Sequence, residues 1–342
     1  MYFYRPILRW KQGEKVALSN LQLAAKNDLV PLFLLGPDQF QPPRGRNPHG
    51  ITAAQSFVNQ VLAVWGTSEF HLDASEIPVQ AGRPHPIVDI AAAARVAGLG
   101  LIPSTTLGAS AAYQAAIATV SATDGRGVTL RVDFAEFNSV ASWISTWPHS
   151  PSVTNLIADF RNTVGVVTAM GTAVAGLFSG LYLGSSWRSV TVAGTSIPAD
   201  FSGFTAGTHI INRAEWQLWQ NLVSTSLPYR LDFGDYATVS LAAAPPTIAW
   251  GYPINVKYTL SGQFLVCKGI KTTGRGAIDM APQLIGHATS IVAHPSRSRI
   301  AGCWGDDRID AIASGTENPG NLGKWVGFSV NRHVERLRLD LP

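Results

Sequence analysis

Short apolar runs of β type alternate with longer segments of helical periodicity over the first two thirds of the chain. The short runs are rich in Val, Ile, Leu and Phe and are bounded by turn residues, as is typical of buried parallel strands. The longer segments repeat apolar residues at helical spacing, as expected of helices that cover a sheet with one face. Eight short runs occur, at residues 4–10, 29–36, 69–75, 100–106, 127–134, 153–160, 187–197 and 228–239. Eight strand–helix units in succession predict an α/β fold, a TIM-like (β/α)8 barrel.

The chain continues beyond the eighth run further than closure of a barrel requires. Residues 254–269 are predicted to form two strands around Ser261-Gly262, a dipeptide that favours a hairpin turn. Two segments of helical pattern follow this hairpin, at residues 281–294 and 304–315, and a last segment contains Trp325 and His333. We therefore expect a barrel over residues 1–245 and a hairpin-plus-helices extension over residues 246–342. The length of 342 residues does not force a second domain, because α/β barrels often need this much chain. The extension is expected to pack on the barrel.

Composition raises the question of a membrane segment. Charged residues make up only 14% of the chain, well below the roughly 25% of soluble domains. Residues 163–187 carry no charge, but their five glycines lower their hydrophobicity and no basic cluster flanks them. We interpret them as a packed helix of the barrel, with a membrane span as the alternative. The first fifteen residues become charged too early for a secretion signal, so a cytoplasmic protein without membrane contact is predicted.

Charge and cysteine content exclude few of the possible ligands and sites. The net charge is +4, and basic residues gather in residues 42–50, 268–276 and 294–299. This pattern permits binding of nucleic acid or another phosphate ligand without requiring it. The two cysteines, Cys267 and Cys303, lack the spacing of a metal site and are expected to be buried thiols.

Acids at the ends of the predicted strands supply the candidate chemistry. Three runs end in Asp-Phe, at Asp133, Asp159 and Asp232, and further acids lie at Asp73 and Asp235. Because the carboxyl ends of barrel strands share one mouth, these acids are expected to converge there. Each one alone could simply cap a helix or a turn. Several carboxylates in one cleft, however, repel one another unless a metal or basic side chains compensate.

One functional hypothesis follows directly from this convergence. A metal-dependent phosphoesterase or nuclease-like hydrolase would hold Mg²⁺ or Mn²⁺ through Asp133, Asp159 and Asp232 and would neutralise the phosphoryl charge with basic side chains. Arg131 lies two residues before Asp133 and should share its face, deeper along the strand. The candidate catalytic residues are Asp133, Asp159, Asp232, Asp235 and Tyr236, and the candidate ligand-binding residues are Lys11, Arg161 and Lys257.

Separated motifs resemble a known family. They are "YRPILRWKQGE" at residues 4–14, "FGDYATV" at 233–239, "KYTLSGQFLVCKG" at 257–269, "WGDDRI" at 304–309, "GNLGKW" at 320–325 and "NRH" at 331–333. In this order they resemble the bacterial and phage beta family proteins. The resemblance implies a barrel-like α/β fold in bacteria, phages or mobile elements and implies no established reaction. Arg332 stands where much of the group is expected to have a second histidine beside His333, which argues against a His pair as a metal site.

The second functional hypothesis is the one we favour. Sequence motifs of phosphate loops, zinc proteases and serine hydrolases are missing from the chain. A binding or interaction component of a phage or mobile-element system, including an anti-phage system, would present its low-charge surface and its extension to a protein partner or another copy. The metal-dependent hydrolase is the alternative. An enzyme acting on a sugar or a phosphorylated metabolite rests on analogy with the fold alone.

Overall fold

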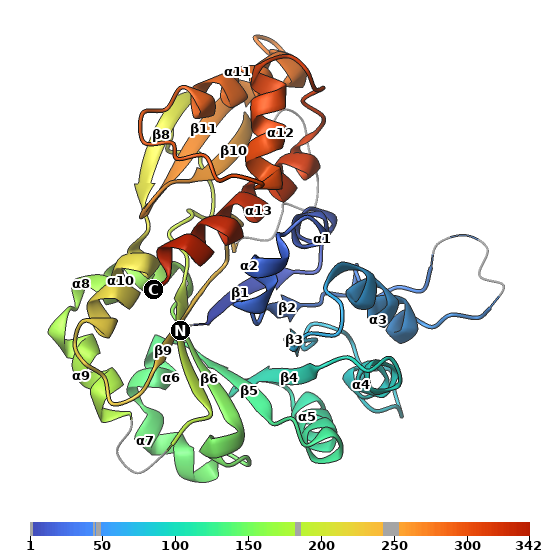
Figure 1. Cartoon of the computed structure of the whole chain (residues 1–342). Coiled ribbons are helices and arrows are strands. Elements are labelled where there is room, and N and C mark those ends of the chain that lie inside the picture. Colours follow the sequence, from blue (N-terminus) through green and yellow to red (C-terminus); the bar gives the residue numbers. More distant parts are fainter. Residues whose placement is uncertain (1–2, 44, 46–48, 182–185, 242–252) are drawn as a thin grey trace.

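A closed barrel of parallel strands forms the centre of the protein (Figure 1). The computed structural model describes residues 3–43, 45, 49–181, 186–241 and 253–342. Around the ring the strands are β1 (Tyr4–Arg9), β2 (Leu32–Leu34), β3 (Phe70–Asp73), β4 (Leu101–Thr106), β5 (Val128–Val132), β6 (Thr154–Asp159), β7 (Ser189–Gly194) and β9 (Leu231–Asp235). β9 pairs with β1 and closes the ring. Each of the eight predicted runs contains one of these strands, so the predicted (β/α)8 barrel is confirmed.

Helices surround the barrel and bury its outer surface. They are α1 (Gln12–Ser19), α2 (Leu23–Asn27), α3 (Ala53–Val64), α4 (Ile87–Val96), α5 (Ala111–Asp124), α6 (Phe134–Asn138), α7 (Val140–Trp143), α8 (Val164–Ala169), α9 (Thr172–Gly180) and α10 (Ala214–Val223). The outward-facing strand residues and the helices share one large core, in which Trp10, Phe33, Phe57 and Phe70 are almost fully buried. This core follows from the pattern of the sequence, because each strand is apolar on its outer face and each helix on its inner face.

The uncharged segment at residues 163–187 differs from its prediction as one helix. It forms α8 and α9, and their directions differ by 110°. Gly171 lies between them with φ +50°, a backbone conformation that residues other than glycine rarely adopt. Over the described parts of the chain, no single helix is long and apolar enough to cross a membrane, although this bent pair passes the same test when the two helices are taken together. Residues 182–185 of the predicted helix lie outside the described residues.

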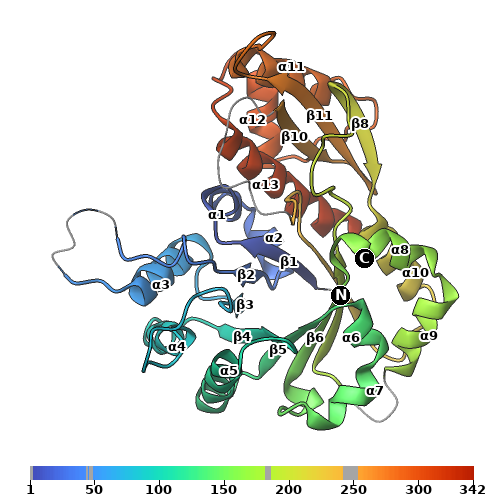
Figure 2. The same ribbon diagram turned by 180° about the vertical axis from the view of Figure 1, so that it is seen from behind.

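A second, smaller sheet with its own helices stands beside the barrel (Figures 1 and 2). Its strand order is β10 (Pro253–Thr259), β11 (Gln263–Lys271) and β8 (Gly207–Asn212), and its helices are α11 (Met280–Val292), α12 (Trp304–Ala313) and α13 (Leu322–Asp340). The predicted hairpin of β10 and β11 is confirmed. β8 is an additional strand that the pattern did not predict, and it comes from the connection between β7 and α10. The predicted boundary at residues 245 and 246 lies outside the described residues.

The long helix α13 joins the two units. It runs from the small sheet to the barrel and lies beside α1 in both views (Figures 1 and 2). The two helices approach so closely at Gly13 that an added Cβ atom would lie 2.7 Å from the side chain of Val326. Trp325 and Phe328, near the start of α13, pack in the core of the small unit, whereas Val334 and Leu337, further along, pack in the core of the barrel. The extension therefore packs on the barrel through α13.

Candidate functional site

The carboxyl ends of three strands bring two acids and one arginine together at the barrel mouth. Asp73 is the last residue of β3, Asp159 is the last residue of β6, and Arg131 lies on β5 between them. The Arg131 guanidinium donates a hydrogen bond to the Asp73 carboxylate, and its Nη1 atom lies 3.5 Å from Asp159 Oδ2. Both acids are almost fully buried. A shared arginine therefore compensates these two carboxylates.

Arg131 and Tyr236 both hold their protons at neutral pH. Burial alone would lower the pKa of Arg131, but the carboxylates of Asp73 and Asp159 outweigh it and raise the pKa above its ordinary value. Tyr236 donates a hydrogen bond of 2.5 Å to Asp159 Oδ2. Burial, and then the charge of Asp159, raise the pKa of Tyr236 well above its ordinary value. At neutral pH the phenol is therefore a hydrogen-bond donor that orients Asp159 and not a base.

Replacing Tyr236 by Phe is expected to lower the free energy of unfolding by about 1–3 kcal/mol, since it removes a donor to a buried charged group. Urea unfolding at neutral pH measures this change. Tyr229 is a suitable comparison, because its hydroxyl donates 2.7 Å to the carbonyl of Phe178, a neutral acceptor. Tyr229→Phe should cost less, about 0.5–1.5 kcal/mol. If Tyr236→Phe is as stable as the wild type, the hydroxyl does not fix Asp159.

The lumen beneath the mouth is filled. Tyr236 and Leu241, which follow β9, pack over Ile7, Leu32 and Ile157 from the barrel wall. The backbone of this segment is also held, because the guanidinium of Arg9 donates 2.8 Å to the carbonyl of Leu241. Open space at the mouth therefore lies to one side of the barrel axis.

That space is a pocket of about 160 Å³ over the ends of β4, β5 and β6. Its polar lining comes from Thr106, Arg131, Asp133, Glu136, Asp159 and Arg161. Asp133 is the N-cap of α6 and forms a capping box with Glu136, in which each carboxylate accepts a 2.9 Å bond from the other residue's amide. Arg161 has φ +48° and its side chain is 56% exposed. The pocket thus offers one exposed cation, Arg161, and the two rim carboxylates of Asp133 and Glu136, above the pair of Arg131 and Asp159.

Asp232 lies at the opposite end of the lumen, so its predicted place at the mouth is wrong. It is the second residue of β9, and the strand continues beyond it to Asp235. Its carboxylate lies 3.4 Å from Arg5 Nη2 and 2.9 Å from Arg230 Nε and accepts from the amide of Phe3. The Asp-Phe pairs at residues 133–134 and 159–160 therefore lie at the mouth, where β5 and β6 end. The Asp-Phe pair at residues 232–233 lies near the start of β9 instead.

Asp235 points out of the barrel wall, and its predicted place at the mouth is also wrong. It accepts hydrogen bonds from Tyr4 Oη at 2.6 Å, from Arg213 Nη2 at 3.1 Å and from His333 Nε2 at 2.8 Å. The other imidazole nitrogen of His333 is 2.9 Å from Thr259 Oγ1. Burial lowers the pKa of His333. Burial alone would raise the pKa of Asp235, but His333 and Arg213 outweigh it and lower the pKa to about 2.

This Asp–His–Thr chain has the connectivity of a nucleophilic triad. Its place in the fold argues against that role, because Asp235, His333 and Thr259 are each 0% exposed. A substrate carbonyl cannot reach Thr259 in this structure. The chain instead joins the barrel strand β9 to β10 and α13 of the second unit, so we interpret it as an interface network.

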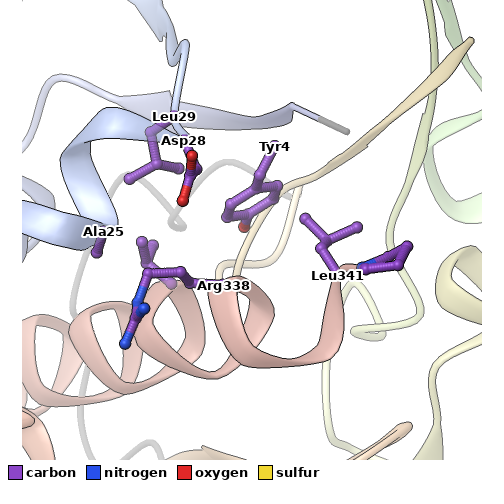
Figure 3. A pocket seen from close by; sticks show the side chains of 8 residues that line it. Tyr4, Ala25, Asp28, Leu29, Arg338 and Leu341 are labelled. Carbon is purple, nitrogen blue, oxygen red and sulfur yellow. The ribbon is translucent and has the colours of Figure 1, made fainter. Parts of the chain in front are cut away.

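A cavity of about 140 Å³ lies beside this network, between α2 and the end of α13 (Figure 3). The ring of Tyr4 forms one wall, with Asp28, Arg338 and Leu341 around it. The hydroxyl of Tyr4 is already bonded to Asp235. The cavity therefore lies against the interface of the two units and not at the barrel mouth.

The three predicted metal ligands do not all meet at one place. Asp133 caps a helix on the rim, Asp159 pairs with Arg131, and Asp232 lies at the other end of the lumen. In the described part of the chain, no group of three or more His, Cys, Asp or Glu side chains could hold a metal ion. The predicted convergence of these three acids on one Mg²⁺ or Mn²⁺ ion is therefore wrong, because Asp232 lies near the start of its strand, at the opposite end of the lumen from Asp133 and Asp159.

Only one of the three predicted ligand-binding cations lines the mouth pocket, namely Arg161. Lys11 follows β1 and lines a separate pocket of about 310 Å³ together with Lys15 and Gln60. Lys257 lies on β10 with its Nζ atom 5.4 Å from the ring centroid of Phe201, and burial lowers its pKa to about 8. The sequence reasoning missed Glu136, although the Asp133-x-x-Glu136 spacing is the signal of a capping box.

The closing motifs form a second buried network. Asp306 of "WGDD" accepts from Tyr258 Oη at 2.8 Å and from the amide of Ile300 at 2.7 Å, and it lies 3.3 Å from Arg332 Nε of "NRH". Gly305 approaches α13 so closely that a Cβ atom would lie 2.3 Å from the carbonyl oxygen of Phe328. These motifs therefore hold α12, α13 and β10 together and supply no group to the mouth.

Fold and site together define a class: a (β/α)8 barrel with an α/β extension, in which an arginine between two acids forms the floor of the mouth. The family model of the Beta protein matches residues 4–338. The chain therefore belongs to the Beta protein family, as the motifs predicted. No curated protein matches the chain. The crystal structure of a glycerol uptake operon antiterminator-related protein from Thermotoga maritima is similar over 69% of this chain and 95% of its own, with 12% identity and a TM-score of 0.33.

Proposed function

We propose that the protein is a binding protein that holds a small ligand of mixed charge at the barrel mouth. The observation that carries the proposal is that the mouth has a floor whose polar groups are bonded to one another and a rim whose charged groups are exposed. In the floor, Arg131 is held between Asp73 and Asp159, and Tyr236 bonds Asp159. These groups are already bonded to one another, and the raised pKa of Tyr236 removes it as a base at neutral pH.

The rim supplies the groups that recognise the ligand. The Arg161 side chain is 56% exposed, and its Nε atom is 4.0 Å from Asp159 Oδ2, beyond hydrogen-bond distance. Its guanidinium suits a carboxylate or phosphate group, which it can bind in a bidentate way. Asp133 and Glu136 each use one oxygen in the capping box, so the other oxygen of each suits an amine. A free amino acid or a similar zwitterion combines both features.

The metal-dependent hydrolase loses one of its predicted ligands, because Asp232 lies at the opposite end of the lumen from Asp133 and Asp159, which both line the mouth pocket. The setting predicted from the sequence, a cytoplasmic component of a phage or mobile-element system with a protein partner, stays a prediction. A phosphate-bearing metabolite remains within the proposal, since the Arg161 guanidinium binds phosphate as well as carboxylate.

A thermal-shift panel of free amino acids, inorganic phosphate and sugar phosphates tests the proposal, because a ligand that binds only the native state raises the melting temperature. We expect at least one mixed-charge compound to raise it in the wild type. Arg161→Gln should weaken its binding by about tenfold or more, as for the loss of a charge-assisted hydrogen bond. Arg275→Gln is the matched control, because Arg275 is an exposed arginine outside the mouth.

Two results would overturn the proposal. One is a panel in which no mixed-charge compound raises the melting temperature, or raises it equally in Arg161→Gln. The other is a rise with Mg²⁺ or Mn²⁺ that EDTA reverses and that Asp133→Asn and Asp159→Asn abolish. The second result would restore the metal-dependent hydrolase.

A further inference from the structure

The outer edge of the small sheet is a strand without the usual protection against pairing. β8 lies at this edge in both views (Figures 1 and 2), and β11 is its neighbour on the inner side. Its six residues, "GTHIIN", include no charge and no proline. Their pairing with β11 runs from Asn212 to Gly207 without a register shift. Natural proteins protect exposed edges with charges, prolines or bulges, and β8 has none of these.

The other sheet edges in the described structure are covered. The barrel closes on itself through β9 and β1 and so has no edge. At the opposite side of the small sheet, β10 lies against α13, where Ser329 Oγ donates 2.6 Å to the carbonyl of Lys257. β8 differs from both, because four of its six residues are exposed and the other two are half-buried. Its outward amide and carbonyl groups are therefore open to a further strand.

We propose that a second copy of this chain pairs with β8 in antiparallel orientation about a two-fold axis, joining the two small sheets into one. A two-fold axis lets the same edge serve both copies, so every free backbone group of one strand meets its equivalent in the other. The strand carries no charge that would repel its copy or select a partner of opposite charge. Self-pairing is therefore the interaction that this edge fits best.

The side chains select a register for this pairing. Thr208, Ile210 and Asn212 share the face of the sheet on which Leu265 packs against the helices, because Ile210 is opposite Leu265 in β11. Ile210 is nevertheless 44% exposed. A two-fold axis at Ile210 places the two Ile210 side chains opposite each other and each Thr208 opposite the partner copy's Asn212. Apolar then meets apolar and polar meets polar on this face, as cross-strand pairing favours.

Mass measurement by light scattering over a range of concentrations tests the proposal. We expect the full chain to approach twice its monomer mass as concentration rises. Ile210→Lys should raise the dimer dissociation constant by about tenfold or more, because it puts two like charges opposite each other at the axis. Leu23→Lys is the matched control, since Leu23 is a large apolar residue of α2 that is 78% exposed. The control should dimerise as the wild type does.

Cross-linking tests the register. Ile210→Cys should form a disulfide-linked dimer under mild oxidation at least about tenfold faster than Leu23→Cys, because directly opposite Cβ atoms are about 4.5–5.5 Å apart. The two native cysteines are buried, so the wild type serves as the background. A chain that stays monomeric at every concentration, or an Ile210→Cys variant that cross-links no faster than Leu23→Cys, would overturn the proposal.

This inference goes beyond the proposed ligand at the mouth and is independent of it. Arg161→Gln should therefore dimerise as the wild type does, and Ile210→Lys should show the same ligand-induced rise in melting temperature. A failure of either proposal can thus be distinguished from a failure of the other.

Discussion

Replacing Asp235 by Ala is expected to lower the free energy of unfolding by about 3–5 kcal/mol, the range for removing one partner of a buried ion pair. The carboxylate is fully buried and receives Tyr4, Arg213, His333 and the amide of Ala237. Alanine leaves these donors without an acceptor in a place that water does not reach. Glu215, 3.2 Å from Arg213 Nε, offsets only part of the loss, because it contacts neither Tyr4 nor His333.

Urea unfolding measures this effect, and Asp124→Ala is the control. Asp124 also pairs with an arginine, at 2.6 Å, but the Arg95 side chain is 48% exposed. Exposed pairs contribute about 0–1 kcal/mol. Equal losses in the two variants would show that the Asp235 network does not hold the two units together.

The same carboxylate should make stability depend on pH. Its pKa is about 2 in the folded protein, below the ordinary value of 3.8. The unfolded chain therefore binds the proton more readily, and the stabilisation is complete above about pH 4 and is lost as the pH falls toward about 2. The shift corresponds to about 2 kcal/mol. The stability difference between the wild type and Asp235→Asn should shrink over this window, and a constant difference would contradict the linkage.

Most of the fold could be predicted from the sequence, because parallel barrel strands are buried on both faces and appear as continuous apolar runs. Two features of the fold could not be predicted from apolar runs. β8 is an exposed edge strand that begins with Gly207 and Thr208 and ends at Asn212, so it has no apolar run. The break between α8 and α9 depends on the backbone of Gly171, and an apolar pattern alone cannot distinguish one helix from two.

The site was predicted less well, and β9 shows why. Asp232 and Asp235 both looked like strand ends, but the sequence does not say where in residues 228–239 the strand begins. A few residues along a barrel strand separate the mouth from the opposite end. Moreover, the two acids are three positions apart, and an odd separation places side chains on opposite faces of a strand. Asp232 therefore faces the lumen and Asp235 faces the interface with the second unit.

The family motifs near the end of the chain make buried packing contacts and do not form a catalytic site. Gly305, Asp306 and Arg332 belong to short motifs that are far apart in the sequence, a pattern that often indicates an active site. In the structure they meet in the core between α12, α13 and β10. A buried charge needs its partner and its close backbone contacts as strictly as a reaction needs its catalytic groups. Short motifs that are far apart in the sequence can therefore indicate either a buried charge network or an active site.

Replacing Arg332 by Met should test this conclusion with a loss of about 3–5 kcal/mol in the free energy of unfolding. Arg332 is 0% exposed; it lies 3.3 Å from Asp306 and donates to Tyr258 Oη at 2.8 Å and to the carbonyl of Ser298 at 2.7 Å. Methionine has a similar length but leaves Asp306 buried without this cation. Urea unfolding at neutral pH gives the value.

Arg308→Met is the matched control on the neighbouring helix α12, because the Arg308 side chain is 42% exposed and lies 3.1 Å from Glu317, and exposed pairs contribute about 0–1 kcal/mol. Adding Asp306→Asn to Arg332→Met should recover part of the loss, because the double variant no longer buries an unpaired charge. If Arg332→Met costs no more than Arg308→Met, these motifs do not maintain the network. If the second substitution adds its full cost instead, Asp306 is stabilised without Arg332, by the Tyr258 hydroxyl and by Arg297, whose Nη2 atom lies 3.7 Å from Asp306 Oδ1.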